Sequence, residues 1–248
     1  MSYELTIDGL TVDFGGFRAV DNFTTTVEKG ELRVVLGPNG AGKTTLMDLI
    51  SGKTKATAGK VRLIGRDITN LPEHKIARSG VGRKFQIPSV FRELTAFQNL
   101  QVAASQQTSI LGSLKFSQTE AEKSIIDEVI NTCSLSDFLD KPAGDLAHGQ
   151  MQWLELGMLI SKRPSLILLD EPTAGMTRDE TYKTAEIIKR LRGDHTLIVV
   201  EHDMAFVKEI AEVITVMHLG KLLAQGDIKE IEGNAAVQEA YLGSGGIH

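Results

Sequence analysis

Short apolar runs alternate with amphipathic stretches along most of the chain, and the period of each run predicts its structure. Tyr3–Ile7 and Phe23–Val27 alternate apolar with polar residues, which is typical of half-buried antiparallel strands. Further strands are expected at Leu32–Leu36, Val61–Ile64, Leu166–Asp170, Thr196–Glu201 and Val213–Met217. Helices are expected at Thr44–Ile50, Glu73–Arg78, Arg178–Arg192 and Met204–Ala211. Short apolar strands that alternate with helices indicate an α/β fold with a parallel sheet covered on both faces.

From about Leu94 to Gly144 the chain has a more helical character than elsewhere. Runs of β-branched residues are scarce there, and Thr119–Cys133 predicts an amphipathic helix. Its expected apolar face consists of Ala121, Ile125, Val129 and Ile130. We therefore predict one domain over residues 1–248, in which residues 1–86 and 165–248 form an α/β core with an antiparallel β subdomain. The residues from about 87 to 164 are expected to form an inserted α-helical subdomain.

The segment Gly37–Thr44 reads Gly-Pro-Asn-Gly-Ala-Gly-Lys-Thr and fits the phosphate-loop pattern G-x-x-x-x-G-K-[ST]. Its glycines let backbone N–H groups converge on phosphate oxygens, and the helix that follows adds its positive end. The candidate nucleotide contacts are Asn39, Gly40, Ala41, Gly42, Lys43, Thr44 and Thr45. Lys43 can reach the β- and γ-phosphates, and the Thr44 hydroxyl can ligate Mg²⁺. Because a strand precedes the loop and a helix follows it, we predict nucleotide binding rather than an ordinary glycine turn.

Two carboxylates follow another apolar strand. Leu166–Leu169 leads directly into Asp170 and Glu171. In open α/β sheets, ligands bind at the carboxyl ends of the strands. Asp170 is therefore a candidate Mg²⁺ ligand, and Glu171 is a candidate for positioning or deprotonating an attacking water. The alternative, that two acidic residues simply end a strand, is less favoured beside a phosphate loop.

Composition narrows the classes of partner. The chain has 248 residues and a net charge of −5, and this acidic balance argues against a nucleic-acid binder. The single cysteine excludes an internal disulfide and fits a reducing compartment. The first ten residues lack the pattern of a signal peptide, and no apolar run approaches the roughly 18 residues of a membrane span. We therefore expect a cytoplasmic protein whose membrane role comes through a partner.

Three further segments, in the same order along the chain, complete a family pattern. Gln86 follows Val81–Phe85, Leu146–Gln150 reads Leu-Ala-His-Gly-Gln before the Leu166 strand, and His202 ends the next strand. Together with the phosphate loop and the Asp-Glu pair, they resemble the nucleotide-binding subunit of an ABC transporter. The resemblance covers essentially the whole chain. It implies a P-loop NTPase core of the RecA-like type that binds ATP with Mg²⁺ and hydrolyses it.

The resemblance also implies roles for single residues. Gln86 matches the glutamine that contacts Mg²⁺ and the attacking water, and His202 matches the switch histidine at the γ-phosphate. Glu171 matches the catalytic glutamate. Phe14 matches the aromatic residue on which adenine stacks, with Phe17 as a competing candidate and core packing as the alternative for Phe14.

Two subunits of such proteins enclose two nucleotides, and each phosphate loop faces the partner's signature. A second ATPase subunit, the same or a related chain, is therefore implied, with nucleotide contacts from Ala147, His148, Gly149 and Gln150. Here Ala147 replaces the serine whose hydroxyl reaches the γ-phosphate, and His148 replaces a glycine. A hydrogen bond to a charged group contributes about 1.5–3 kcal/mol. We therefore predict weakened but not abolished turnover.

Finer features resemble the branched-chain amino-acid uptake class. They are Gly82–Gln86, Ser89–Phe91, Leu94–Thr95, Ala174–Thr177 and Ala240–Gly243. Within that class, Gln152–Glu155 and Glu201–Met204 are most similar to the urea-uptake ATP-binding subunit, so urea is the expected solute and branched-chain amino acids are the alternative.

The resemblance further implies a place at the cytoplasmic face of the membrane. Two permease subunits would contact about Ile87–Gln101. The alternative for that segment is internal packing of the helical subdomain. An extracytoplasmic solute-binding protein would complete the transport system. One rival is an ABC-fold regulatory module that binds ATP with little hydrolysis. Another is a soluble ABC protein that acts on nucleic acid, which the acidic balance disfavours.

Overall fold

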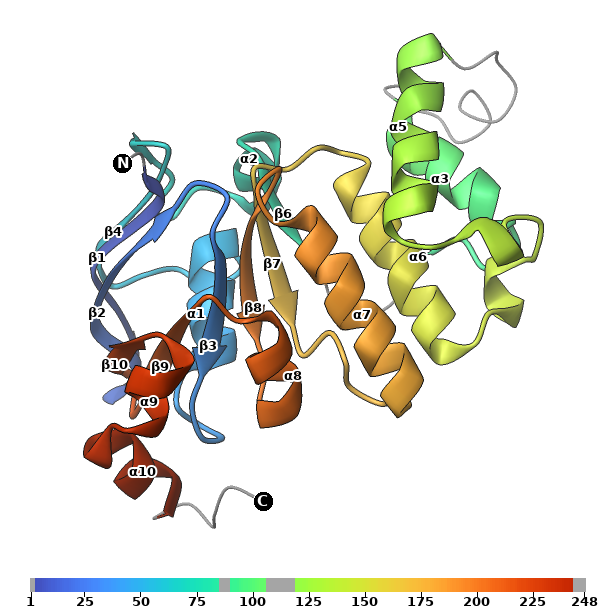
Figure 1. Ribbon diagram of the computed structural model, residues 1–248. Coiled ribbons are helices and arrows are strands. Elements are labelled where there is room, and N and C mark those ends of the chain that lie inside the picture. Colours follow the sequence, from blue (N-terminus) through green and yellow to red (C-terminus); the bar gives the residue numbers. More distant parts are fainter. Residues whose placement is uncertain (1–2, 85–89, 106–118, 243–248) are drawn as a thin grey trace. The chain divides into compact units, whose positions relative to one another are not determined.

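The computed structural model describes residues 3–84, 90–105 and 119–242, which divide between two compact units. The first unit comprises Met1–Arg83, Ser165–Pro172 and Arg192–His248, and the second comprises Lys84–Pro164 and Thr173–Leu191. The elements of both units are labelled in Figure 1. Among the described residues, none of the helices combines the length and the apolar character that crossing a bilayer requires.

A six-stranded sheet forms the centre of the first unit. Its order is β10 (Lys221–Gly226), β9 (Val213–His218), β3 (Leu32–Leu36), β8 (Thr196–Val200), β7 (Leu166–Asp170) and β6 (Val81–Arg83). All neighbouring pairs from β9 to β6 are parallel, and only β10 runs antiparallel at the edge. The arrowheads of β3 and β7 accordingly point the same way in Figure 1. Every residue of β3 and β8 is buried, which explains why their sequences are mostly apolar rather than alternating. The one charged residue, Arg33 of β3, pairs with Glu31 at 2.6 Å.

A second, antiparallel sheet belongs to the same unit. Its order is β2 (Phe17–Glu28), β1 (Tyr3–Phe14), β4 (Ala58–Leu63) and β5 (Arg66–Asp67). One core connects both sheets through α1 (Lys43–Ser51), since Leu46, Met47, Leu49 and Ile50 are buried with residues of β1, β7 and β8. The helix that follows the phosphate loop is therefore anchored on both sides. The remaining helices of this unit are α2 (Glu73–Arg78), α8 (Met204–Ile210), α9 (Ile228–Glu232) and α10 (Ala235–Leu242).

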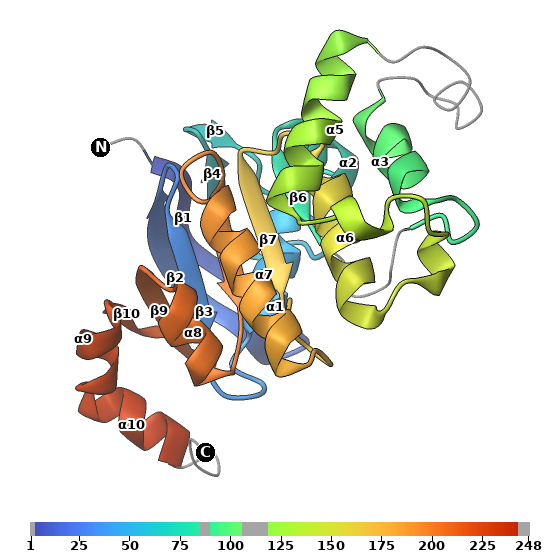
Figure 2. The same ribbon diagram turned by 45° about the vertical axis from the view of Figure 1, so that its right-hand side comes forward.

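The second unit is helical. Its helices are α3 (Ala96–Ala104), α5 (Glu120–Thr132), α6 (His148–Ile160) and α7 (Arg178–Leu191), with short 3₁₀ turns at Ser136–Phe138 and Ala143–Asp145. Figure 2 shows α3, α5 and α6 side by side. A Cβ on Gly157 of α6 would lie 2.9 Å from Val129 of α5 and 3.3 Å from Leu100 of α3, so glycine allows these helices to approach closely. Thr95 and Thr119 begin α3 and α5 with capping boxes.

The predicted fold class is confirmed: an α/β core, an antiparallel β sheet and a helical part are all present. β3, β7 and α2 have the predicted bounds. The predicted apolar face of α5 is partly wrong, because Ala121 is exposed and Ile126 is buried instead. The pattern gave no indication of β10, α9 or α10, whose residues are only partly buried.

Candidate functional site

The phosphate loop connects β3 to α1 in a conformation that requires glycine. Gly40 and Gly42 have φ of 80° and 100°. A Cβ on Gly42 would collide with the carbonyl oxygen of Ala19, and one on Gly37 would collide with that of Met217. Within the described residues, the backbone N–H groups of Gly42, Lys43 and Thr44 donate to no protein acceptor. The loop therefore presents a row of amides at the positive end of α1.

Lys43 begins α1 and curls back over this loop. Its Nζ donates to the carbonyl oxygens of Gly37 at 2.6 Å and Pro38 at 3.0 Å. Burial lowers the pKa of Lys43, while the nearby carboxylates of Asp170 and Glu171 act in the opposite direction. The ammonium group is thus held among the loop carbonyls, with the two predicted carboxylates close enough to influence it.

Asp170 ends β7 with its side chain only 4% exposed. Burial raises the pKa of Asp170, and a hydrogen bond from the Thr44 side chain together with the charge of Arg83 opposes that rise. Its Oδ2 atom accepts no hydrogen bond from any described residue. A buried carboxylate oxygen without a donor, next to a hydroxyl, suits a hard divalent cation such as Mg²⁺. Among the described residues, no group of three or more His, Cys, Asp or Glu side chains is placed to hold a metal ion.

Arg83 at the end of β6 connects two carboxylates, a role that the sequence pattern did not reveal. Its Nη1 lies 2.6 Å from Oδ1 of Asp48 and donates to the Ser51 hydroxyl at 2.8 Å. Its Nη2 lies 3.9 Å from Oδ2 of Asp170. The guanidinium charge therefore lies between Asp48 of α1 and the predicted Mg²⁺ ligand Asp170.

Glu171 follows β7 in a strained conformation. Its φ is 47°, which is uncommon for a residue other than glycine. Its backbone N–H donates to the carbonyl oxygen of Val200 at 2.9 Å, extending the β7–β8 ladder by one bond. Oε1 of Glu171 lies 3.5 Å from Nδ1 of His202, which follows β8. Parallel neighbouring strands thus bring the predicted catalytic pair together, and both side chains remain open to solvent.

Phe14 and Phe17 face each other across the two-residue Gly15-Gly16 turn of the β1–β2 hairpin. Their exposed fractions are 55% and 65%, so the core-packing alternative for Phe14 is wrong. Both rings are available for stacking, and the choice between them stays a prediction.

The signature segment opens α6 in the helical unit. Ala147 is the N-cap and has no oxygen to offer, whereas the Gln150 side chain accepts from the Ala147 N–H at 3.1 Å. The Gly149 N–H donates to Oε1 of Glu180 at 3.2 Å. Nε2 of His148 lies 3.1 Å from the carbonyl oxygen of Ala174, so this nitrogen carries the proton. The signature is thus attached to the segment that precedes α7.

Trp153 adds a buried contact between the same two helices. Its Nε1 donates to the Thr184 hydroxyl at 2.9 Å, and Nζ of Lys183 lies 4.2 Å from its ring centre.

Two of the predicted sites lie outside the described residues in whole or in part. They are Gln86 and the first part of Ile87–Gln101.

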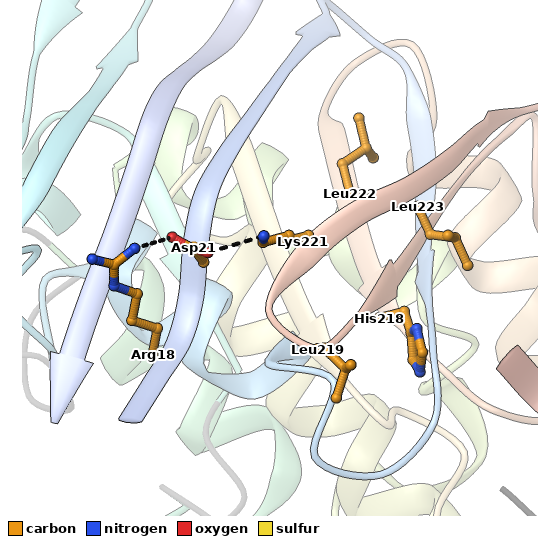
Figure 3. A pocket seen from close by; sticks show the side chains of 7 residues that line it. All are labelled: Arg18, Asp21, His218, Leu219, Lys221, Leu222 and Leu223. Carbon is orange, nitrogen blue, oxygen red and sulfur yellow. Dashed lines mark hydrogen bonds and ion pairs between the residues drawn. The ribbon is translucent and has the colours of Figure 1, made fainter. Parts of the chain in front are cut away.

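A pocket of about 470 Å³ lies beside the β9–β10 hairpin (Figure 3). Asp21 pairs with Arg18 at 3.0 Å and with Lys221 at 3.2 Å along its wall. At the hairpin tip, the Gly220 N–H donates to the carbonyl oxygen of Ala41 at 3.0 Å, which supports the phosphate loop from behind. The residues that line the pocket do not include those predicted to bind nucleotide.

A family model described as ABC transporter matches residues 20–174, which is more than half of the chain. The chain belongs to the ABC transporter family. It is 39% identical to the high-affinity branched-chain amino acid transport ATP-binding protein BraF of Pseudomonas aeruginosa, covering 96% of this chain and 97% of BraF. It is 37% identical to the corresponding LivG protein of Escherichia coli, over 96% and 97% of the two chains.

A solved structure supports the same assignment. An ATP-binding cassette of an ABC transporter in its ADP conformation superposes with a TM-score of 0.84 at 30% identity, covering 98% of this chain and 99% of that one. The predicted P-loop NTPase fold and the prediction of an ATPase are therefore confirmed.

Proposed function

We propose that this ABC ATPase powers the uptake of branched-chain amino acids through separate permease subunits. The support is the near-complete alignment with BraF and LivG, whose names state that transport. These comparisons favour the sequence alternative over the main expectation of urea. The two segments behind that expectation also have structural roles here: Trp153 packs against Thr184, and the buried Glu201 accepts from the His202 N–H at 3.2 Å.

The observation that carries the ATPase chemistry is the buried Oδ2 of Asp170, which accepts no hydrogen bond from the described residues and lies beside Thr44. We assign Asp170 and Thr44 to Mg²⁺, which would neutralise phosphate charge when bound. The amides of Asn39–Thr45 and the Lys43 ammonium bind the phosphates of ATP. Lys43 exchanges its present bonds to the Gly37 and Pro38 carbonyls for bonds to phosphate oxygens.

Glu171 orients and deprotonates the attacking water, and the adjacent His202 contacts the γ-phosphate. The open position of both side chains suits this role, because a partner subunit would cover them when it closes. Gln86 contributes to Mg²⁺ and the water, and Phe14 stacks on adenine. The signature residues Ala147–Gln150 face the γ-phosphate bound by a second ATPase subunit.

As an ABC transporter ATP-binding subunit, the chain works at the cytoplasmic face of the membrane. Two permease subunits would contact about Ile87–Gln101, and an extracytoplasmic solute-binding protein would deliver the solute. Phe91 is 39% exposed in the described part of that segment, which suits an apolar contact with a permease.

Uptake measurements test the proposed solute. Cells that carry either the wild-type chain or Glu171→Gln are compared for uptake of labelled leucine and labelled urea. We expect the variant to lose leucine uptake and to keep urea uptake, with equal amounts of both proteins confirmed by immunoblot. Loss of urea uptake alone would overturn the proposed solute. If neither changes although the purified protein hydrolyses ATP, the importer assignment itself fails.

A further inference from the structure

Glu180 connects the N-termini of two helices through one carboxylate. It lies in the first turn of α7, where its Oε2 accepts from the Thr177 N–H and hydroxyl, each at 2.9 Å. Its Oε1 accepts from the Gly149 N–H in the first turn of α6 at 3.2 Å. The hydrogen bonds from Thr177 lower the pKa of Glu180, so the side chain stays ionised.

The Glu180 carboxylate fills the space beside the Gly149 backbone that a side chain at this position would occupy. A Cβ on Gly149 would collide with Oε1 of Glu180 and would lie 2.6 Å from its Cδ. Gly149 does not have a left-handed φ, and a Cβ there would require the flexible Glu180 side chain to move. The Glu180 carboxylate therefore lies directly on the backbone of the signature.

The Glu180 carboxylate thus occupies the place at the N-terminus of α6 where the proposed nucleotide sandwich would put the negatively charged γ-phosphate. The first-turn amides of α6 are the groups that would meet the γ-phosphate bound by the partner. Two anions at one helix N-terminus repel each other, and one amide N–H cannot serve both fully.

We propose that Glu180 occupies the Gly149 amide in the open subunit and that the γ-phosphate of the partner's ATP must displace it before the dimer closes. This inference rests on the proposed function. Glu180 is a positioning residue, since it acts through the signature amide and not on ATP itself. It raises the ATP concentration that closure needs, and it keeps empty or ADP-bound subunits apart.

The rest of the local structure lets the carboxylate move at little cost. Oε2 can keep both bonds to Thr177 while Oε1 swings away, so α7 stays capped. His148 meanwhile remains bonded to Ala174, which keeps the signature attached to the segment before α7. Because Ala147 supplies no hydroxyl, the Gly149 amide carries more of the phosphate contact than it would beside a serine.

The test measures ATP-driven dimerisation in a Glu171→Gln background, in which ATP hydrolysis is expected to be strongly slowed. The ATP concentration for half-maximal dimer is determined by light scattering after gel filtration. Adding Glu180→Gln removes the charge and keeps a side chain of the same shape, and we expect the half-maximal ATP concentration to fall about tenfold. Asp179→Asn is the matched control, because it removes the same charge one residue away, on an exposed side chain.

A purely structural role for Glu180 predicts a different pattern. If Glu180 acts through its charge, the half-maximal ATP concentrations of Glu180→Gln and its parent should become more similar at high salt, because salt screens the repulsion. It also expects a lower KM for ATP with little change in kcat when Glu171 is intact. An unchanged or higher half-maximal ATP concentration in Glu180→Gln would overturn the inference. If the Glu171→Gln parent forms no dimer at any ATP concentration, the proposed sandwich fails instead.

Discussion

Nδ1 of His202 lies 3.5 Å from Oε1 of Glu171, although 31 positions separate the two residues along the chain. Adjacent parallel strands β7 and β8 end at the same edge of the sheet and bring them together. Glu171 approaches His202 from a left-handed backbone conformation, with a φ of 47° that most residues other than glycine avoid. Strain at this position is therefore part of how the site is built.

Replacing Glu171 with glycine rather than alanine measures that strain. Both variants remove the carboxylate, and only glycine adopts this φ without a steric penalty. We expect Glu171→Gly to be more stable than Glu171→Ala by about 1 kcal/mol in chemical denaturation. Equal stabilities, or a more stable alanine variant, would show that the backbone is not strained.

Restoring the signature serine tests the effect of Ala147. Ala147→Ser supplies an N-cap oxygen to α6, and this is expected to stabilise the protein by about 1 kcal/mol. The same hydroxyl can reach the γ-phosphate, so we expect ATPase activity to rise by about tenfold or more. Thermal unfolding and steady-state hydrolysis report the two effects separately. A stabilised variant with unchanged activity would mean that this hydroxyl does not limit turnover.

Arg83 is expected to contribute more to stability than any exposed ion pair. The side chains of Arg83 and Asp48 are 7% and 16% exposed, and removing one member of such a pair leaves a buried charge uncompensated. Arg83→Met should cost about 3 kcal/mol of unfolding free energy. Arg163→Met is the control, because Arg163 and Glu128 are 59% and 60% exposed and should contribute at most about 1 kcal/mol. Similar losses in the two variants would contradict this account.

Cys133 gives a prediction on pH. Burial raises the pKa of its thiol from an ordinary 9.0 to about 12. The fold thus favours the protonated thiol, so this contribution to stability is complete below about pH 9 and is lost as the pH rises towards 12. We expect the native protein to resist thiol reagents at neutral pH. We also expect Cys133→Ala to flatten the decline in stability above pH 9, and rapid labelling of the folded protein would contradict the assignment.

Much of the fold and the candidate site could be predicted from sequence because the signals are local. The apolar runs of β3 and β7 and the glycine pattern of Gly37–Thr44 each lie within a few residues. Contacts between distant segments left no such signal. Arg83 reaches Asp48 on α1, and Glu180 reaches Gly149 on α6, and neither partner can be read from spacing.

The choice of solute shows the same limit. Trp153 suggested a urea-type subunit when considered as part of a motif, whereas the structure gives it a packing partner in Thr184.

The buried face of α5 also depends on contacts with other segments. Ile126 rather than Ala121 is buried there, because neighbouring helices, and not helical period alone, decide which face is covered.

Steady-state ATP hydrolysis by the wild-type chain and by Glu171→Gln, with and without Mg²⁺, tests the central claim most directly. The account predicts Mg²⁺-dependent hydrolysis by the wild type and a loss of about 100-fold or more in the variant, with ATP binding retained. Equal rates in the two proteins, or hydrolysis that persists without Mg²⁺, would contradict the roles assigned to Glu171 and Asp170.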